Sequence, residues 1–210
     1  MSMSTPMADQ IDHTDVGPAG EDVCVTAVSL HGRGYELYWP TELSDTERQE
    51  LLSLYDEVAR HEATHGFTGS IANEVGRRIV DTDAESLAAG QILMLLARDS
   101  DGIVGSLILQ PYTSQARKHT VNAKRAVVAR RARGTIFPLM VDAAIQRAVA
   151  VGAEVVTCDV ASDGPLGLWK SLGFIEYGVM PDYARRHGKS LDGYFLHMRL
   201  PAKAVVEPTV

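Results

Sequence analysis

The sequence predicts a mixed α/β (α+β) fold, and three stretches of the chain carry this prediction. The first is an amphipathic helix over residues 45–65, which begins at the capping box formed by Ser44 and Glu47. The second is a pair of apolar runs around the turn DSDG, which predicts a β-hairpin over residues 91–109. The third is the succession of strand, helix and strand over residues 121–160, which alternates the two kinds of element along one chain.

The remaining segments are assigned by the same patterns. A first strand comes from VCVTAVSL or YELYWP, and residues 70–90 mix helical and loop signals and stay undecided. A short helix is expected over residues 164–173, and FIEYGVM and GYFLHMRL are expected to close the chain as strands. We expect residues 1–20 to be a disordered leader, residues 21–200 to form one domain, and residues 201–210 to be a C-terminal tail.

Composition limits the classes of protein that fit. With 210 residues, 45% of them hydrophobic, the chain can bury one substantial core. The net charge of −7 argues against a nucleic-acid-coating protein, so nucleic acid is an unlikely partner. Cys24 and Cys158 lie far apart, which argues against a disulfide framework or a structural zinc site and favours the cytoplasm. The sequence contains neither an apolar run of about 18 residues nor a targeting signal, so we expect no membrane partner.

Residues 61–66 read HEATHG and match H-E-x-x-H, the helix-borne pattern of zinc proteases. The spacing places His61 and His65 on one helix face. Gly66 follows at once, however, so His65 would occupy the last, fraying residue of the helix. We therefore expect no metal here and regard a zinc hydrolase as the least favoured function, while a contact of His61, Glu62 or His65 with a substrate stays open.

Seven of the chain's 20 Lys and Arg residues fall within 17 residues. They are Arg117, Lys118, Lys124, Arg125, Arg130, Arg131 and Arg133. The first three are expected to be solvated, whereas the last three flank a strand-to-helix turn. Backbone N–H groups and the helix dipole favour anions at such a turn, so we expect phosphate contact there.

Three motifs follow one another in the second half of the chain. Arg131-Ala132-Arg133-Gly134-Thr135-Ile136 opens a helix and occupies the place of R/Q-x-x-G-x-G/A, and LWKSLGF resembles L-Y-x-x-x-G-F. Alignment on the preceding strand would instead start the first motif at Arg133-Gly134. GVMPDYARRHGKSLDGYFLHMRL matches the last loop and strand of small-molecule acetyltransferases, including the tabtoxin-resistance type. Residues 91–200 thereby resemble the GNAT N-acetyltransferase superfamily.

The resemblance implies a twisted mixed sheet of six or seven strands flanked by helices. It implies an acyl-CoA donor, most simply acetyl-CoA, and direct transfer to a small-molecule amine in a ternary complex. The donor would enter where two parallel strands separate near Val128 and Asp159, with oxyanion stabilisation by the backbone at Val127–Val128. A homodimer is left open. The expected donor-binding residues are Val127, Val128, Arg130, Arg131, Arg133, Gly134, Thr135, Ile136 and Trp169.

The chain departs from the family pattern at three places. Ile136 replaces the final Gly/Ala, Trp169 replaces the tyrosine that protonates the thiolate, and Asn122 replaces a glutamate base. The candidates at the reacting centre are therefore Asn122, Tyr183 and His119, with Asp163 as a further one. His119 could equally be a surface residue, Asp163 a helix cap and Tyr183 a packing residue. The alternatives to an acetyltransferase are a binding module that lost catalysis and an acyltransferase with a carrier-protein or aminoacyl-tRNA donor.

Overall fold

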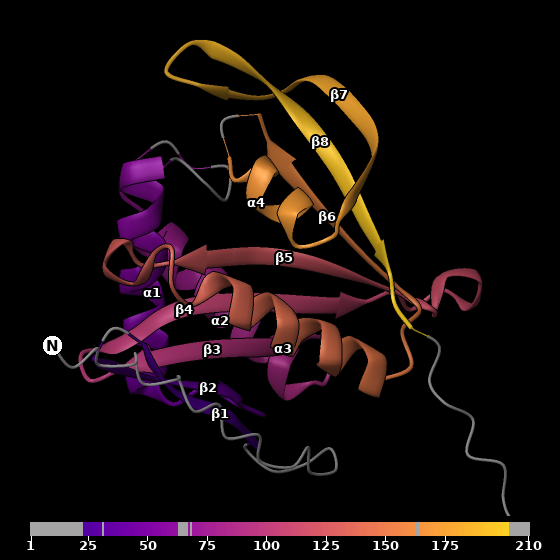
Figure 1. Ribbon diagram of the computed structural model, residues 1–210. Helices are drawn as coiled ribbons and strands as arrows, with labels where there is room; N and C mark the ends of the chain where they lie inside the picture. The colour runs from indigo at the N-terminus through magenta and orange to yellow at the C-terminus, as the bar shows by residue number, and fades with distance from the viewer. Residues whose placement is uncertain (1–22, 31, 63–66, 68, 163, 202–210) are drawn as a thin grey trace, which may run out of the picture.

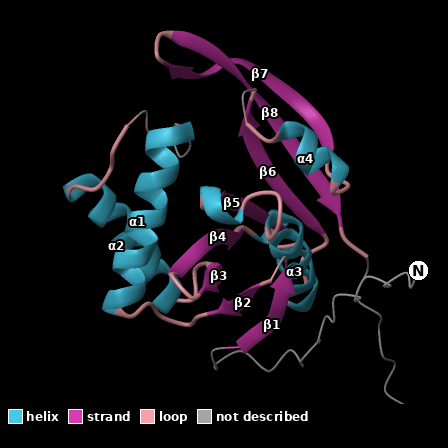
Figure 2. Cartoon of the chain, turned by 60° about the vertical axis from the view of Figure 1, so that its left-hand side comes forward, coloured by secondary structure: helices cyan, strands magenta, loops and turns pink. Residues whose placement is uncertain are grey.

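The computed structural model describes residues 23–30, 32–62, 67, 69–162 and 164–201, which form one eight-stranded sheet with helices on both of its faces (Figures 1 and 2). The expected leader at 1–20 and tail at 202–210 lie outside the described residues. The elements in chain order are β1 (Val23–Leu30), β2 (Arg33–Trp39), α1 (Asp45–Glu62), α2 (Glu74–Ala88), β3 (Leu93–Asp99), β4 (Gly102–Pro111), η1 (Gln115–Arg117), β5 (Thr120–Val128), η2 (Arg130–Ala132), α3 (Phe137–Ala150), β6 (Val155–Ala161), α4 (Leu166–Ser171), β7 (Ile175–Arg186) and β8 (Lys189–Arg199).

The strand order is β1-β2-β3-β4-β5-β6-β8-β7. Neighbouring strands are antiparallel except β5 and β6, which are parallel and are joined through the crossover helix α3. The sheet has more strands than the six or seven expected, because VCVTAVSL and YELYWP both form strands. They pair as a hairpin through Gly32, whose φ of 76° suits glycine.

The core lies on both sides of the central strands. Strands β3 and β4 are almost continuously apolar, and residues 103–109 of β4 are all buried. Their side chains pack against α1 and α2 on one face and against α3 on the other (Figure 2). A strand covered on both faces needs apolar residues at successive positions, which explains why this hairpin appears as two unbroken apolar runs.

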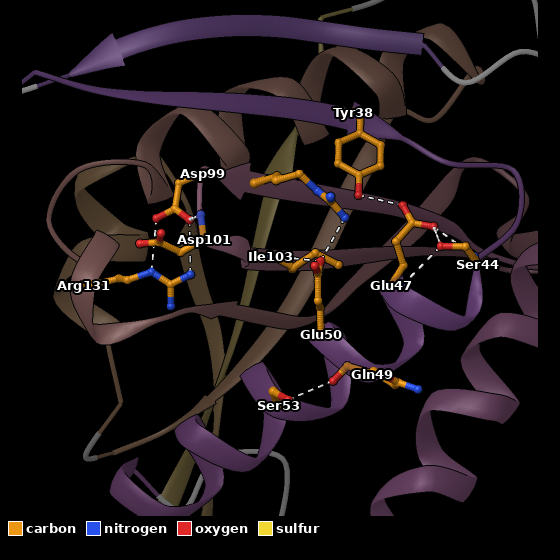
Figure 3. Close-up of polar contacts among 11 residues, drawn as sticks. Tyr38, Ser44, Glu47, Gln49, Glu50, Ser53, Asp99, Asp101, Ile103 and Arg131 are labelled. Carbon is orange, nitrogen blue, oxygen red and sulfur yellow. Dashed lines mark hydrogen bonds and ion pairs between the residues drawn. The ribbon is translucent and has the colours of Figure 1, made fainter.

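Helix α1 begins as the capping box predicts. The Glu47 N–H donates to Ser44 Oγ (3.3 Å) and the Ser44 N–H donates to Glu47 Oε2 (2.9 Å; Figure 3). Tyr38 on β2 donates its hydroxyl to Glu47 Oε1 (2.8 Å), which ties the start of the helix to the sheet. The helix ends at Glu62 rather than at residue 65.

The undecided segment 70–90 contains helix α2, whose start is set by a contact from outside the segment. Asp56 of α1 is buried and accepts from Ser70 Oγ (2.7 Å) and from the N–H groups of Ile71 (2.7 Å) and Ala72 (2.9 Å). Asn73 then caps the helix through the N–H groups of the first turn. Because Asp56 lies more than ten residues earlier in the chain, local patterns could not reveal this start.

Gly76 lies where α2 packs closely against α1 and the segment before α2, so a substitution here tests this packing. A Cβ at this position would lie 1.9 Å from the Ile71 carbonyl oxygen and 2.7 Å from Leu52 Cδ1. Gly→Ala within a helix normally stabilises by about 0.5–1 kcal/mol, but here we expect Gly76→Ala to lower the free energy of unfolding by about 2 kcal/mol. Urea denaturation measures it. Gly167→Ala in α4, where nothing lies within 4 Å of the new Cβ, is the control and should not destabilise; equal effects would contradict the packing.

Candidate active site

The central feature of the site is the separation of the two parallel strands. Strands β5 and β6 pair only at Thr120↔Val155, Val121↔Val156 and Asn122↔Thr157. Beyond Asn122, β5 continues to Val128 along β4, while β6 continues to Ala161 along β8 (Figure 1). Residues 123–128 and 158–161 therefore border an opening in the sheet. On the edge that faces this opening, neither segment pairs with another described strand. The opening matches the expected place of divergence near Val128 and Asp159.

A β-bulge lies in β5 beside this opening. Ser106 pairs with Val127 and Ile108 pairs with Lys124, so β5 holds one residue more than β4 between these two pairs. Arg125, within the bulge, has a φ of 50°, which a residue with a long side chain rarely adopts. The bulge bends β5 and redirects the side chains next to the opening.

Beyond β5 the chain turns into α3 through η2 and Gly134, whose φ is 73°. Ile136 is the N-cap of α3 and supplies no side-chain hydrogen bond to the first turn. The N–H groups of Gly134 and Thr135 donate to no backbone carbonyl within the part of the chain that the structure describes. An uncapped helix N-terminus with free N–H groups attracts anions, so the turn can hold a phosphate.

The three arginines of the turn lie in different places. Arg131 donates two hydrogen bonds to Asp99, Nε to Oδ2 (3.1 Å) and Nη2 to Oδ1 (3.2 Å; Figure 3). Arg133 directs Nε back to the Val128 carbonyl at 3.4 Å. The Arg130 side chain is exposed, and its N–H donates to Glu57 Oε1 (2.9 Å). Arg130 and Arg133 therefore stay candidates for phosphate contact, whereas Arg131 links the turn to the β3–β4 hairpin.

The Asp99 carboxylate is the buried anchor of this turn. It accepts from Arg33 (3.1 Å) and from the Asp101 N–H (2.9 Å) in addition to Arg131, and its side chain has no exposed surface. Burial alone would raise the pKa of Asp99, but the hydrogen bonds from Arg131 and the Asp101 N–H and the arginine charges lower it below its usual value. Asp99 is therefore ionised at neutral pH and holds Arg131 in place.

The two bulky replacements in the family motifs are core residues. Ile136 is fully buried, so its side chain points away from the free N–H groups of the turn. Trp169 is buried between Phe137 and Phe174, with ring centroids 5.2 Å and 4.8 Å apart and near-perpendicular planes. Trp169 thus packs α4 against the start of α3. Pro138, in the first turn of α3, removes one N–H donor there.

Two of the proton-transfer candidates, Asn122 and His119, lie at the N-terminal end of β5. Asn122 is the last paired residue before the opening, and its Oδ1 accepts from Thr157 Oγ1 (3.1 Å). His119 is exposed and precedes the first paired residue, so it lies four residues, about 13 Å, from the start of the opening at residue 123. The structure therefore keeps His119 away from the opening. Asp163 lies outside the described residues.

Tyr183 reaches the opening from β7. Its hydroxyl donates a short hydrogen bond to Asp159 Oδ2, and its ring lies over Gly193 of β8, where a Cβ would come within 2.3 Å of the ring. Burial and the hydrogen bond to Asp159 raise the pKa of Tyr183 to about 12. Asp159 follows Thr157 on the same face of β6, so Tyr183, Asp159 and the Asn122–Thr157 pair line one face beside the opening.

Sequence reasoning missed three residues at this opening. Asp159 was used only to mark where the strands separate, although a carboxylate inside the apolar run EVVTCDV signals a side chain that faces away from the core. Lys124 was expected to be solvated and Arg125 was given no role. Lys124 and Arg125 line a pocket of about 230 Å³ between β5 and the helices α1 and α2, together with Tyr55, Phe67, Ile71 and Ile79. Only the bulge, which no sequence pattern shows, places both residues there.

The H-E-x-x-H segment lies partly beyond the structure. His61 is exposed in the last turn of α1, the side chain of Glu62 is not described, and His65 lies outside the described residues. Among the residues that are described, no cluster of three or more His, Cys, Asp or Glu side chains could hold a metal ion. The described helices also include none long and apolar enough to cross a membrane.

The role of Asp99 as an anchor is testable by its pH dependence. Because its pKa is lowered on folding, the stabilisation is complete above the unfolded value of about 3.9 and is lost as the pH falls through the folded value. We expect Asp99→Asn to cost about 2–3 kcal/mol at pH 6 and the difference from wild type to shrink below pH 4. Asp101→Asn, at an exposed position of the same turn, is the control. Denaturant unfolding at pH 3–7 measures both, and a pH-independent difference would show that the charge of Asp99 has no role.

Comparison with known proteins identifies the fold. No family model matches the chain, and no curated protein matches it. Among solved structures, a GNAT-superfamily phosphinothricin acetyltransferase from Sinorhizobium meliloti, in complex with acetyl-CoA, is 17% identical with a TM-score of 0.65, covering 82% of this chain and 93% of that one. A GNAT-family acetyltransferase from Streptococcus pneumoniae is 20% identical with a TM-score of 0.64, covering 79% and 100% of the two chains.

A third solved structure has the same fold, and its name gives a protein as the acceptor. The ribosomal-protein-alanine N-acetyltransferase from Brucella melitensis is 19% identical with a TM-score of 0.62, covering 77% of this chain and 99% of that one. At these identities the likeness concerns the fold alone. The fold predicted from the motifs, a GNAT-type mixed sheet flanked by helices, is confirmed, with eight strands in the sheet.

Proposed function

We propose that this protein, which has the GNAT fold, is an acyl-CoA-dependent N-acyltransferase, most simply an acetyltransferase, that acts on the amine of a small molecule by direct transfer. One observation carries the proposal: the opening between β5 and β6 leads directly to the uncapped N-terminus of α3. A donor with a diphosphate at one end and an amide-containing arm ending in a thioester needs these two features side by side. Acetyl-CoA bound in solved structures of the same fold supports the donor class.

The residues of the chain fit such a donor. The N–H groups of Gly134 and Thr135 can donate to a diphosphate, and the exposed Arg133 belongs to the same turn. The free backbone edge of β5 over residues 123–128 can pair with the amides of an extended arm, as an added strand would. Val127 and Val128 are buried, so a backbone N–H donated from this edge to an oxyanion acts in a low-dielectric site. The bound donor supplies an activated acyl group, and the protein positions the acceptor against it.

Tyr183 and Asp159 are the pair best placed to move protons. Asp159 accepts the proton of the attacking amine and, once protonated, donates to the phenol oxygen, so the phenol hydrogen is free to turn toward the leaving thiolate. The pKa of about 12 at Tyr183 belongs to the state in which Asp159 is ionised. Once Asp159 has taken the amine proton and donates it to the phenol oxygen, Tyr183 can pass its own proton to the thiolate, so the proton lost by the amine ends on the leaving thiol. Asn122 orients groups without taking a proton.

A binding module without catalysis is the second candidate, because two features weaken the anion site. Arg131 is committed to Asp99, and Pro138 removes an N–H from the first turn of α3. Release of free thiol from acetyl-CoA in the presence of a panel of small amines separates the two functions. Turnover supports the acyltransferase, whereas tight binding of coenzyme A without turnover on any amine supports the binding module.

The donor site is tested by coenzyme A binding in variants of the turn. Gly134→Val places a side chain at a φ of 73° and distorts the N–H groups of the turn, and Arg133→Ala removes a guanidinium from the turn. Since a charge-assisted hydrogen bond contributes about 1.5–3 kcal/mol, we expect each variant to bind coenzyme A about tenfold to a hundredfold more weakly. Lys118→Ala, at an exposed residue outside the turn, should bind normally. Calorimetric titration decides, and wild-type affinity in both turn variants would mean that the turn does not hold the donor.

The role of Tyr183 is tested by removing its hydroxyl. Tyr183→Phe keeps the ring over Gly193, so we expect kcat to fall about a hundredfold, the low end of the usual contribution of a positioned proton donor, while KM for the acceptor stays unchanged. Tyr177→Phe is the matched control, because Tyr177 lies on the same strand, is 59% exposed and contacts Phe195 and His197. Steady-state kinetics with acetyl-CoA measure both. An unchanged kcat in Tyr183→Phe would assign the proton to water.

A further inference from the structure

We propose that the acceptor is a small amine with an apolar body and an anionic group, of which a hydrophobic amino acid is the simplest example. The pocket between β5, α1 and α2 would hold the body and the anion, and the amine would face the opening. This inference rests on the proposed acyltransferase function and specifies the acceptor class of the same site. The observations that carry it are the position, the lining and the charge of the pocket.

The pocket adjoins the place where the acyl group would be transferred. Lys124 in its wall lies two residues beyond Asn122, the last residue of β5 that pairs with β6. The volume of about 230 Å³ equals that of about eight water molecules at roughly 30 Å³ each. A compact apolar group of this size fits in the pocket.

The apolar part of the lining comes from the helical side of the pocket. Tyr55 belongs to α1 and Ile79 to α2, while Phe67 and Ile71 belong to the connection between these helices. The Tyr55 hydroxyl is paired with Ser106 Oγ (3.3 Å), so this buried polar group does not need a hydrogen bond from a ligand. This wall suits an aliphatic or aromatic side chain, because burying an apolar group there releases water from apolar surface.

The opposite wall carries two cations because of the bulge. In a regular strand Lys124 and Arg125 would point to opposite faces of the sheet. The extra residue in β5 and the φ of 50° at Arg125 place both side chains against the same pocket. A strained backbone that brings two consecutive cations together indicates a site built to recognise charge.

Among the residues that the structure describes, a carboxylate balances only one of these two charges. Arg125 pairs with Asp83 of α2, whose side chain is 5% exposed. Lys124 Nζ donates to the neutral Gln110 Oε1 (2.7 Å) and meets no carboxylate among the described residues. Partial burial lowers the pKa of Lys124 through desolvation, which agrees with a cation that lacks a counter-charge. The wall therefore favours a carboxylate and disfavours an ammonium group, so the amine of the acceptor must lie toward Asp159.

The experiment compares amines that differ only in the anionic group. Leucine, methionine and phenylalanine are each assayed against the corresponding amino-acid amide, with acetyl-CoA as donor and thiol release as readout. The amides have the same shape and, with α-amino pKa values of about 7.7–8.0, more free amine at pH 8, so intrinsic reactivity favours them. We expect the free amino acids nevertheless to have kcat/KM values at least tenfold higher. Equal or better turnover of the amides would overturn the inference and leave the acyltransferase function standing.

Variants of Lys124 assign the effect to the pocket. Lys124→Gln should lower kcat/KM for the amino acids at least tenfold, mainly through KM, and change that of the amides less than twofold. Lys124→Arg keeps the charge and should restore the preference, whereas Lys118→Gln, at an exposed lysine outside the pocket, should change nothing. A loss in Lys124→Gln that is equal for amino acids and amides would show a structural role and overturn the proposal.

A binding measurement separates this inference from the proposed catalysis. N-acetyl-L-leucine and N-acetyl-L-leucinamide are titrated calorimetrically into the wild type and Lys124→Gln, which requires neither the donor nor turnover. Tighter binding of the acid than of the amide, lost in Lys124→Gln, supports the pocket assignment even if no amine is acetylated. Equal binding of the two ligands, or a preference for the amide, contradicts it whether or not acetyl-CoA is turned over.

Discussion

The parallel pairing of β5 and β6 ends after three residue pairs, and the proposed chemistry depends on this short pairing. β5 stays paired with β4 to its end and β6 stays paired with β8, so both strands are held while the edges between them separate. An opening in the middle of a sheet leaves backbone N–H and C=O groups without partners, which is costly unless water or a ligand satisfies them. A ligand with amides along its length is therefore the natural partner of this opening. The antiparallel pairs with β4 and β8 hold the two strands on either side of the opening.

The turn that follows β5 is held by carboxylates from elsewhere in the fold. Asp99 at the end of β3 binds Arg131, and Glu57 of α1 accepts from the Arg130 N–H (Figure 3 shows the Asp99 contact). These contacts orient the turn while the N–H groups beyond it stay free, so most of the positive potential offered to a phosphate comes from backbone N–H groups and Arg133. The buried Ile136 belongs to the same arrangement, because a large apolar side chain at the N-cap fixes the start of α3 from the core side. Ile136, which stands where the family pattern has Gly or Ala, thus affects the packing of α3 more than the access of a ligand to the turn.

The two sides of the opening, β6 with β7 and β5, carry groups of opposite charge. Asp159 and Tyr183 offer a carboxylate and a phenol from β6 and β7, and Lys124 offers an unbalanced cation from the bulge in β5. A ligand with separated positive and negative groups is favoured by both faces at once, whereas a simple cation or a simple anion is favoured by only one. The bulge, the connection between α1 and α2 and the β7–β8 hairpin together set this pattern. The bulge and the connection between α1 and α2 lie outside the motifs from which the fold was predicted, so the specificity of the site can vary while the architecture stays constant.

The sequence alone determined most of the elements and the family of the fold, because capping boxes, apolar periodicity and turn residues act within a few positions of the chain. It predicted α1 from Ser44 and Glu47, the β3–β4 hairpin from two apolar runs, and the turn between β5 and α3 from residues 131–136. It missed the start of α2, which depends on Asp56, and could not place His119 away from the opening. Only the tertiary structure decided the partner of each charged group: Asp99 for Arg131, Asp159 for Tyr183 and Asp83 for Arg125. The physical reason is that ion pairs, bulges and strand divergence arise between residues tens of positions apart in the sequence. The spacing of apolar and polar residues within one segment does not show which distant residues come together in space.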